Sequence, residues 1–209
     1  MTPQTIIQTA RQIVNDNASD PTAYRQTDAE LLKYVNAGLQ EACNLSPETF
    51  LTIGNYSCTT GQTEQKIIFA DAKQLIDVIR VKDGKAIHQT DSAILASFNP
   101  DWSSEVAGAP QNWLRIKKDP LRFYLYPKAP AMLVLEVSYV KNPNTYALGE
   151  TITDVPQTWE SALADFVIYR IESKDDEHSV SGRAISHYRS FVQKINGITP
   201  PAAAPATAA

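Results

Sequence analysis

The sequence has little of what catalytic and metal centres are usually made from. Its 209 residues include eight glycines, three histidines and two cysteines. The glycines are not clustered, and no G-x-x-x-x-G-K-[ST] loop, G-x-G-x-x-G turn, G-x-S-x-G elbow or H-E-x-x-H helix occurs. Cys43 and Cys58 lack metal-ligand spacing and are too few for a disulfide framework. We therefore expect no enzyme, no catalytic residues, no metal and no cofactor.

Long apolar runs and an excess of basic residues are also missing. The longest apolar runs, such as AMLVLEV, are far too short to span a bilayer, so we expect no membrane contact. The opening residues lack the basic and apolar segments of a signal peptide, which makes a cytosolic origin the default expectation. The net charge is −4 and the pI is near 5.4. Phosphate contacts usually require a basic face, so this balance counts against a dedicated nucleic-acid binder.

Helical periodicity marks both ends of the chain. Apolar residues recur every three or four positions over residues 3–14, 27–43, 156–174 and 179–196, which predicts four amphipathic helices. The second of them opens with TDAE, which has the spacing of a capping box. No such helix can bury its apolar stripe alone, so we expect the N-terminal pair to pack on the C-terminal pair.

Between about residues 50 and 141 the pattern changes to short β-branched and aromatic segments bounded by turn residues. Alternating polarity in LIDVIRV and LEVSYV is typical of half-buried antiparallel strands. We predict an α+β protein in which a small antiparallel β-subdomain is inserted into a four-helix bundle made from the N- and C-terminal helix pairs. The predicted parts are residues 1–48 and 151–197 for the helix pairs, 49–150 for the β-subdomain and 198–209 for an extended Pro/Ala-rich tail.

The stretch DPLRFYLYPKAP, residues 119–130, is the strongest candidate for an interaction surface. Asp119 and Pro120 predict a tight turn into a strand. Strand alternation gives that strand a core face of Leu121, Phe123 and Leu125 and an outer face of Arg122, Tyr124 and Tyr126. Two phenols and a guanidinium group suit a hairpin surface or a protein interface.

Two other functional classes remain open. Aromatic rings beside cations also stack on bases, which would give a nucleic-acid platform around Lys117, Lys118 and Arg122. A metal-dependent DNA-processing protein would use Asp175 and His178, which are three residues apart and can share a helix face. A solvated turn between two helices explains that acidic run more simply.

The order of several motifs resembles that of the head-to-tail adaptor proteins of tailed bacteriophages, including the tubular adaptor of short-tailed phages. The resemblance covers most of residues 1–195. It is carried by TDAELLKYVNAGLQEA (27–42), LIDVIRV (75–81), FNPDW (98–102), RFYLYPKAP (122–130), LEVSYVKNP (135–143) and WESALADFVIYRIESKDDEHSVSGRAISHYRSF (159–191).

This resemblance implies a structural virion protein at the head–tail junction, assembled in the cytoplasm of the bacterial host. Family members form a ring, commonly of twelve subunits, that joins the portal to the tail or nozzle and surrounds the DNA exit channel. The helices typically build the ring and touch the portal, whereas the β-part faces outward or toward the tail. The implied partners are further copies of the chain, the portal protein, a tail or nozzle protein and tail fibres. DNA passes through without sequence-specific binding.

Two sets of contact residues follow as expectations. Portal contacts are expected from the last helix and the tail, namely Tyr188, Phe191, Lys194, Ile198, Pro200, Pro201 and Pro205. Contacts with a neighbouring subunit or the tail are expected from Trp102, Arg122, Tyr124, Tyr126, Arg170 and Arg183.

Overall fold

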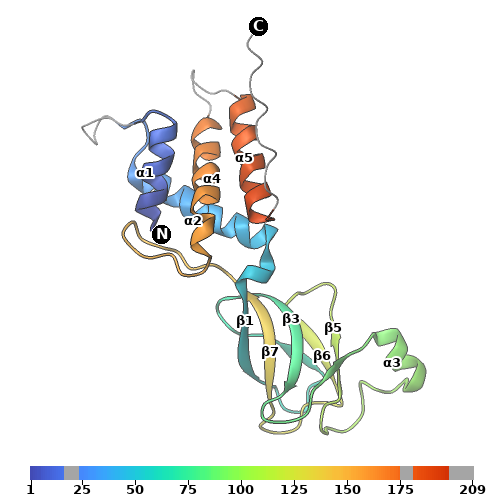
Figure 1. Ribbon diagram of the computed structural model, residues 1–209. Coiled ribbons are helices and arrows are strands. Elements are labelled where there is room, and N and C mark those ends of the chain that lie inside the picture. The colour runs from blue at the N-terminus through green and yellow to red at the C-terminus, as the bar shows by residue number, and fades with distance from the viewer. Residues whose placement is uncertain (17–23, 175–180, 198–209) are drawn as a thin grey trace. The chain divides into compact units, whose positions relative to one another are not determined.

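The two ends of the chain fold together, and the middle forms a separate compact unit. The computed structural model describes residues 1–16, 24–174 and 181–197. Residues 1–49 and those from 143 onward form one unit, here called the helical unit, and residues 50–142 form the other, here called the β unit (Figure 1). The α+β class predicted from the sequence is confirmed.

The first two long helices begin where the sequence supplies capping boxes. The helical unit contains α1 (Pro3–Ile13), α2 (Asp28–Leu45), α4 (Glu160–Glu172) and α5 (Ser181–Ile195), and a 3-10 helix, η3 (Gln157–Trp159), leads into α4. At α2 the Glu30 amide donates to the Thr27 hydroxyl, and the Thr27 amide donates back to the Glu30 carboxylate at 3.1 Å. That amide, with the Lys174 ammonium group nearby, lowers the pKa of the Glu30 carboxyl group.

The core of the helical unit is built around α4. Residues 162–168 of α4 are buried without interruption, which is the pattern of a helix enclosed on several sides. It contacts α1, α2 and α5, and α2 comes so close at Gly38 that a Cβ there would lie 3.0 Å from Phe166. Figure 1 shows α1, α4 and α5 running alongside one another while α2 crosses them. A four-helix bundle in the strict sense is therefore not established.

The segment that returns from the β unit belongs with the helices. Residues 143–150 were placed with the strands by the sequence, but they pack on α2. The Asn36 side chain donates to the Tyr146 carbonyl at 3.1 Å and accepts from the Tyr146 amide at 3.0 Å. This pairing joins positions 110 residues apart, so no local pattern marks it.

The β unit consists of two sheets that enclose one apolar core. One sheet has the order β1-β7-β3, and the other, here called sheet B, has the order β2-β6-β5-β4. All pairs are antiparallel except β4 with β5, which the antiparallel prediction did not include. The strands are β1 (Leu51–Ser57), β2 (Glu64–Lys66), β3 (Ala72–Val81), β4 (His88–Gln89), β5 (Asn112–Arg115), β6 (Arg122–Tyr126) and β7 (Val134–Lys141).

A short helix, α3 (Ser92–Phe98), lies between β4 and β5, where the sequence predicted a loop over part of the segment. Its first turn is capped by the Asp91 carboxylate, which accepts from the Ala93 amide at 2.8 Å. None of its residues is buried, so helical periodicity gave no signal for it. Among the described residues, no helix combines the length and apolar content that crossing a membrane requires.

Removing the ring of Phe191 should strongly destabilise the helical unit. Phe191 is fully buried and its ring centroid lies 5.1 Å from that of Phe166. A Phe-to-Ala change at such a site costs about 3–5 kcal/mol of unfolding free energy. Urea denaturation followed by far-ultraviolet circular dichroism measures it. Ile185→Ala, on the same helix at a half-exposed position, should cost about 1 kcal/mol or less. Equal losses for the two variants would contradict this account of the core.

Candidate functional site

The hairpin of β5 and β6 divides into two faces as the sequence predicts. Phe123 and Leu125 are fully buried, and Leu121 is partly buried against the same core. The ring of Phe123 meets that of Trp113 on β5 edge to face, with centroids 6.4 Å apart. The core face of the strand is thus confirmed, and it fixes the direction in which the alternate residues point.

The outer face of the hairpin is partly covered by the segment between β4 and β5. We call this segment, residues 90–111, the arm. The Trp102 ring packs edge to face on Tyr124, with centroids 5.7 Å apart, and the Asn99 amide lies 3.1 Å from the Tyr126 hydroxyl. Trp102, Tyr124 and Tyr126 therefore contact one another or the arm within a single chain, and they hold the base of the arm on sheet B.

Arg122 is engaged by carboxylates of its own chain. Its guanidinium group donates to Glu64 on β2 and, from Nε at 3.0 Å, to Asp119 in the turn before β6. The hydrogen bond to Glu64 and the charge of that carboxylate raise the pKa of Arg122. Lys117 and Lys118 in the turn are exposed, and within the described parts of the chain no carboxylate pairs with either.

The tip of the arm presents apolar side chains to solvent. Phe98 at the end of α3 is 86% exposed, Val106 is 85% exposed, and Ile94 is also exposed. The base is nevertheless anchored, because the Thr63 hydroxyl donates to the Ser103 carbonyl at 3.1 Å and the Gly108 amide donates to the Lys128 carbonyl at the same distance. A fixed base with an apolar tip is a feature of interaction surfaces.

One of the buried polar clusters in the described part of the helical unit is centred on Asp165 of α4. Its carboxylate accepts from Ser190 at 2.7 Å and Lys194 at 2.6 Å, and lies 2.8 Å from Nδ1 of His187. Ser190 donates to the carboxylate and not to the imidazole, so the cluster lacks the nucleophile–base contact of a triad. The geometry instead ties α5 to α4.

The α5 residues predicted to contact a portal lie partly inside this helix packing. Phe191 has no exposed surface in the single chain. Tyr188 is partly exposed and donates to Glu41 on α2 at 2.8 Å, and Lys194 is engaged with Asp165. Hydrogen bonding to the Glu41 carboxylate raises the pKa of Tyr188.

The other predicted contact residues of the helical unit have partners in the chain. The Arg170 guanidinium group lies 5.3 Å from the centroid of the Tyr34 ring. Arg183 lies 3.6 Å from Glu172 and donates to the Ile13 carbonyl at 3.1 Å. These contacts help to hold α4 and α5 against the N-terminal helices.

Several predicted positions lie outside the described residues. They are Ile198, Pro200, Pro201 and Pro205 in the tail, and Asp175 and His178, which were considered as metal ligands. Among the residues that the structure describes, no group of three or more His, Cys, Asp or Glu side chains could hold a metal ion.

The two cysteines sit in the interiors of different units. Cys43 is buried on α2, and Cys58 is partly buried against the core of the β unit, and neither forms a disulfide. Burial raises the pKa of the Cys58 thiol to about 12. The thiol is therefore protonated, and weakly nucleophilic, across the physiological range.

The comparisons with known proteins define the class of this one. A family model matches the chain over residues 1–209, and it describes structural head–tail adaptors of phage particles. The chain belongs to the SU10 adaptor protein family. The resemblance drawn from the order of its motifs is confirmed.

Among solved structures, the chain is similar to a chain in the "neck of empty GTA particle computed with C6 symmetry". The two are 13% identical over 91% of each chain, with a TM-score of 0.32. No curated protein matches the sequence. The family assignment therefore rests on the family match.

Cys58 should resist alkylation in the folded protein. At pH 9 an unfolded thiol, with an ordinary pKa near 8.5, is mostly ionised, whereas a thiol with a pKa of about 12 is not. We expect iodoacetamide to modify Cys58 at least about 100-fold more slowly in buffer than in urea. Peptide mass spectrometry separates it from Cys43. The pKa of this thiol is higher in the folded state than in the unfolded state. Its contribution to the free energy of unfolding therefore falls as the pH rises from about 8.5 toward 12. Rapid labelling of Cys58 in the folded protein at pH 9 would contradict the assignment.

Proposed function

We propose that this protein joins the portal of a phage head to the tail or nozzle, as a ring of copies that surrounds the DNA exit channel. The single observation that carries the proposal is the match of the SU10 adaptor family over the whole sequence. We propose twelve copies and assembly in the host cytoplasm, with tail fibres as a further partner. No catalytic role is proposed, in keeping with a structural family.

In this proposal the two units make different contacts. The helical unit, a compact four-helix assembly, forms the inner contacts of the ring and meets the portal, and the β unit faces the tail or a neighbouring copy. On α5 the residues with exposed surface include Tyr188, Lys194 and Ile185, and these are the proposed portal-facing side chains. Residues 198–209, including Ile198, Pro200, Pro201 and Pro205, are proposed to extend along the portal. Phe191 contributes by holding α5 on α4.

The charge balance supports a channel that binds the DNA phosphates only weakly. The chain carries 23 acidic and 19 basic residues, and the most prominent arginine of the hairpin, Arg122, is neutralised by Glu64 and Asp119. Few phosphate contacts give little salt-dependent affinity, so DNA can pass. A nucleic-acid-binding role predicts the opposite behaviour.

Mixing the purified protein with its portal should give ring-shaped complexes. The expected result is a discrete adaptor–portal particle by size-exclusion chromatography and a ring with cyclic symmetry in electron micrographs, because a closed ring needs a repeated heterologous contact. A protein that stays monomeric beside the portal, with no ring in the micrographs, would overturn the proposal. A retardation assay with duplex DNA at low salt should show no shift, and a strong salt-sensitive shift would favour the nucleic-acid alternative.

A further inference from the structure

The arm carries an apolar surface that the described residues of the chain leave exposed. Figure 1 shows α3 extending away from the strands of the β unit. Its Phe98 and Ile94 are exposed, as is Val106 in the following loop, while Trp102 and Asn99 fix the base of the arm on the hairpin. The anchoring contacts lower the entropy cost of docking, because the base of the arm is already ordered.

The arm is also acidic. Its charged residues are Asp91, Asp101 and Glu105, and it contains no lysine, arginine or histidine, so its net charge is −3. Asp91 caps α3 and Glu105 accepts from Asn99, but within the described ranges no cation pairs with any of the three carboxylates. A surface that accepts the arm should therefore be basic with an apolar component.

Such a surface occurs on the β unit itself. We call it the basic corner, and it comprises Lys66, Ile68, Lys117, Lys118 and Arg122. Lys66 pairs in register with Arg122, and the Ile67 amide donates to the Leu121 carbonyl at 2.9 Å, which brings the β2 end beside the turn of the hairpin. Ile68 is 78% exposed and lines a hollow of about 410 Å³ together with Lys66 and Arg122.

The charge of the basic corner remains positive after its own carboxylates are counted. Glu64 and Asp119 lie beside it, and both bind Arg122. Lys66, Lys117 and Lys118 are exposed and have no ion-pair partner among the described residues. Four cations against two carboxylates leave a net charge of +2 facing solvent.

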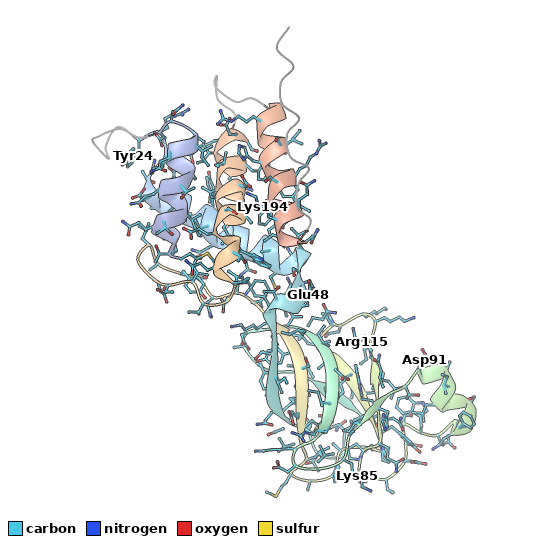
Figure 2. All side chains as sticks on the ribbon, in the orientation of Figure 1. Tyr24, Glu48, Lys85, Asp91, Arg115 and Lys194 are labelled. Carbon is cyan, nitrogen blue, oxygen red and sulfur yellow. The ribbon has the colours of Figure 1, made fainter. Side chains whose placement is uncertain are left out.

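The arm and the basic corner are different surfaces of the β unit, although the base of the arm reaches Tyr124 on β6 and Thr63 just before β2. In the strand order β2-β6-β5-β4, α3 follows β4 at one edge, and Lys66 and Ile68 belong to β2 or follow it at the other. Figure 2 places Asp91 at the start of α3. A head-to-tail contact between identical chains needs two different complementary faces on each copy, and the acidic arm and the basic corner differ in both residues and charge.

We propose that the arm of one copy docks on the basic corner of the next copy, with Phe98 seated in the hollow lined by Lys66, Ile68 and Arg122. This contact rests on the proposed ring, and it assigns the outward part of the subunit interface to the β unit. A second copy is favoured over DNA because the arm would repel phosphates. It is favoured over another protein because the complementary charge and a hollow beside the exposed side chain of Ile68 are both present on this chain.

Replacing Phe98 should weaken the assembly without unfolding the protein. Phe98→Ser removes an exposed ring, so the unfolding transition should stay where it is. A central aromatic anchor is worth about 2 kcal/mol or more at an interface, so the concentration for half-assembly on the portal should rise about 30-fold or more. Sedimentation or mass photometry of adaptor–portal mixtures measures it. Met132→Ser is the matched control, because Met132 is 94% exposed in the same unit and should have no effect.

A photo-crosslinking residue at position 98 identifies the occupant in assembled adaptor–portal rings. The expected products join position 98 to residues 64–68 or 115–122 of another copy. Crosslinks to the portal, to added DNA or to other parts of the chain would overturn the proposal, as would a Phe98→Ser variant that assembles normally. If the wild-type protein forms no ring with the portal, the proposed function is contradicted. If rings form normally but these crosslinks are absent, only the docking contact is contradicted.

Charge reversal provides an independent test with a built-in rescue. Lys117→Glu with Lys118→Glu should weaken assembly about 10-fold at low salt, and less at high salt, because the pairing is electrostatic. Asp101→Lys in the arm should do the same, since its carboxylate has no partner among the described residues. The chain carrying all three changes should regain assembly.

Lys82→Glu with Lys85→Glu, in the exposed turn after β3, is the matched control. Unchanged assembly of the Lys117/Lys118 variant, or no recovery in the triple variant, would contradict the docking contact.

Discussion

The enclosure of α4 is the constraint on which the helical unit depends. Residues 162–168 are buried around the helix, so α4 requires neighbours on several sides at once. Two of these neighbours, α1 and α2, come from the other end of the chain, and at Gly38 a Cβ would lie only 3.0 Å from the Phe166 ring. The burial of α4 therefore depends on contacts between the two ends of the chain. The polar cluster at Asp165 completes this packing by binding α5 through Lys194 and Ser190.

The β unit combines a rigid frame with one apolar projection. Its interior includes Trp113, Phe123 and Leu125, and the outer tyrosines of the hairpin contact the arm. As a result, the aromatic residues that are most conspicuous in the sequence are anchors within the chain. The exposed apolar residues of the arm are less conspicuous ones, such as Phe98 and Val106. This arrangement places exposed apolar side chains on a segment that is anchored on sheet B.

The parts of the fold that follow from local chemistry were predictable. The Thr27 capping box and the core face of the 121–125 strand each depend on neighbouring residues, and the structure contains them. The crossing of α2, the parallel pair of β4 with β5 and the pairing of Asn36 with Tyr146 were not predictable, because each depends on contacts between residues that are distant in the sequence. The candidate site was found only in part. Tyr124 and Tyr126 pointed to the hairpin surface, but α3 has no buried residue and so gave no periodic signal.

The sequence by itself determined the α+β class, the helical character of both ends, the alternating faces of the hairpin and, through the order of its motifs, the adaptor family. Backbone propensity, capping and polarity alternation act over a few residues, and that is the range a sequence pattern can report. Only the tertiary structure decided that Phe191 lies inside the helical core, that Arg122 is neutralised by Glu64 and Asp119, and that the arm stands free at its tip. Burial and charge pairing depend on which surfaces meet, and folding brings those surfaces together from distant parts of the chain.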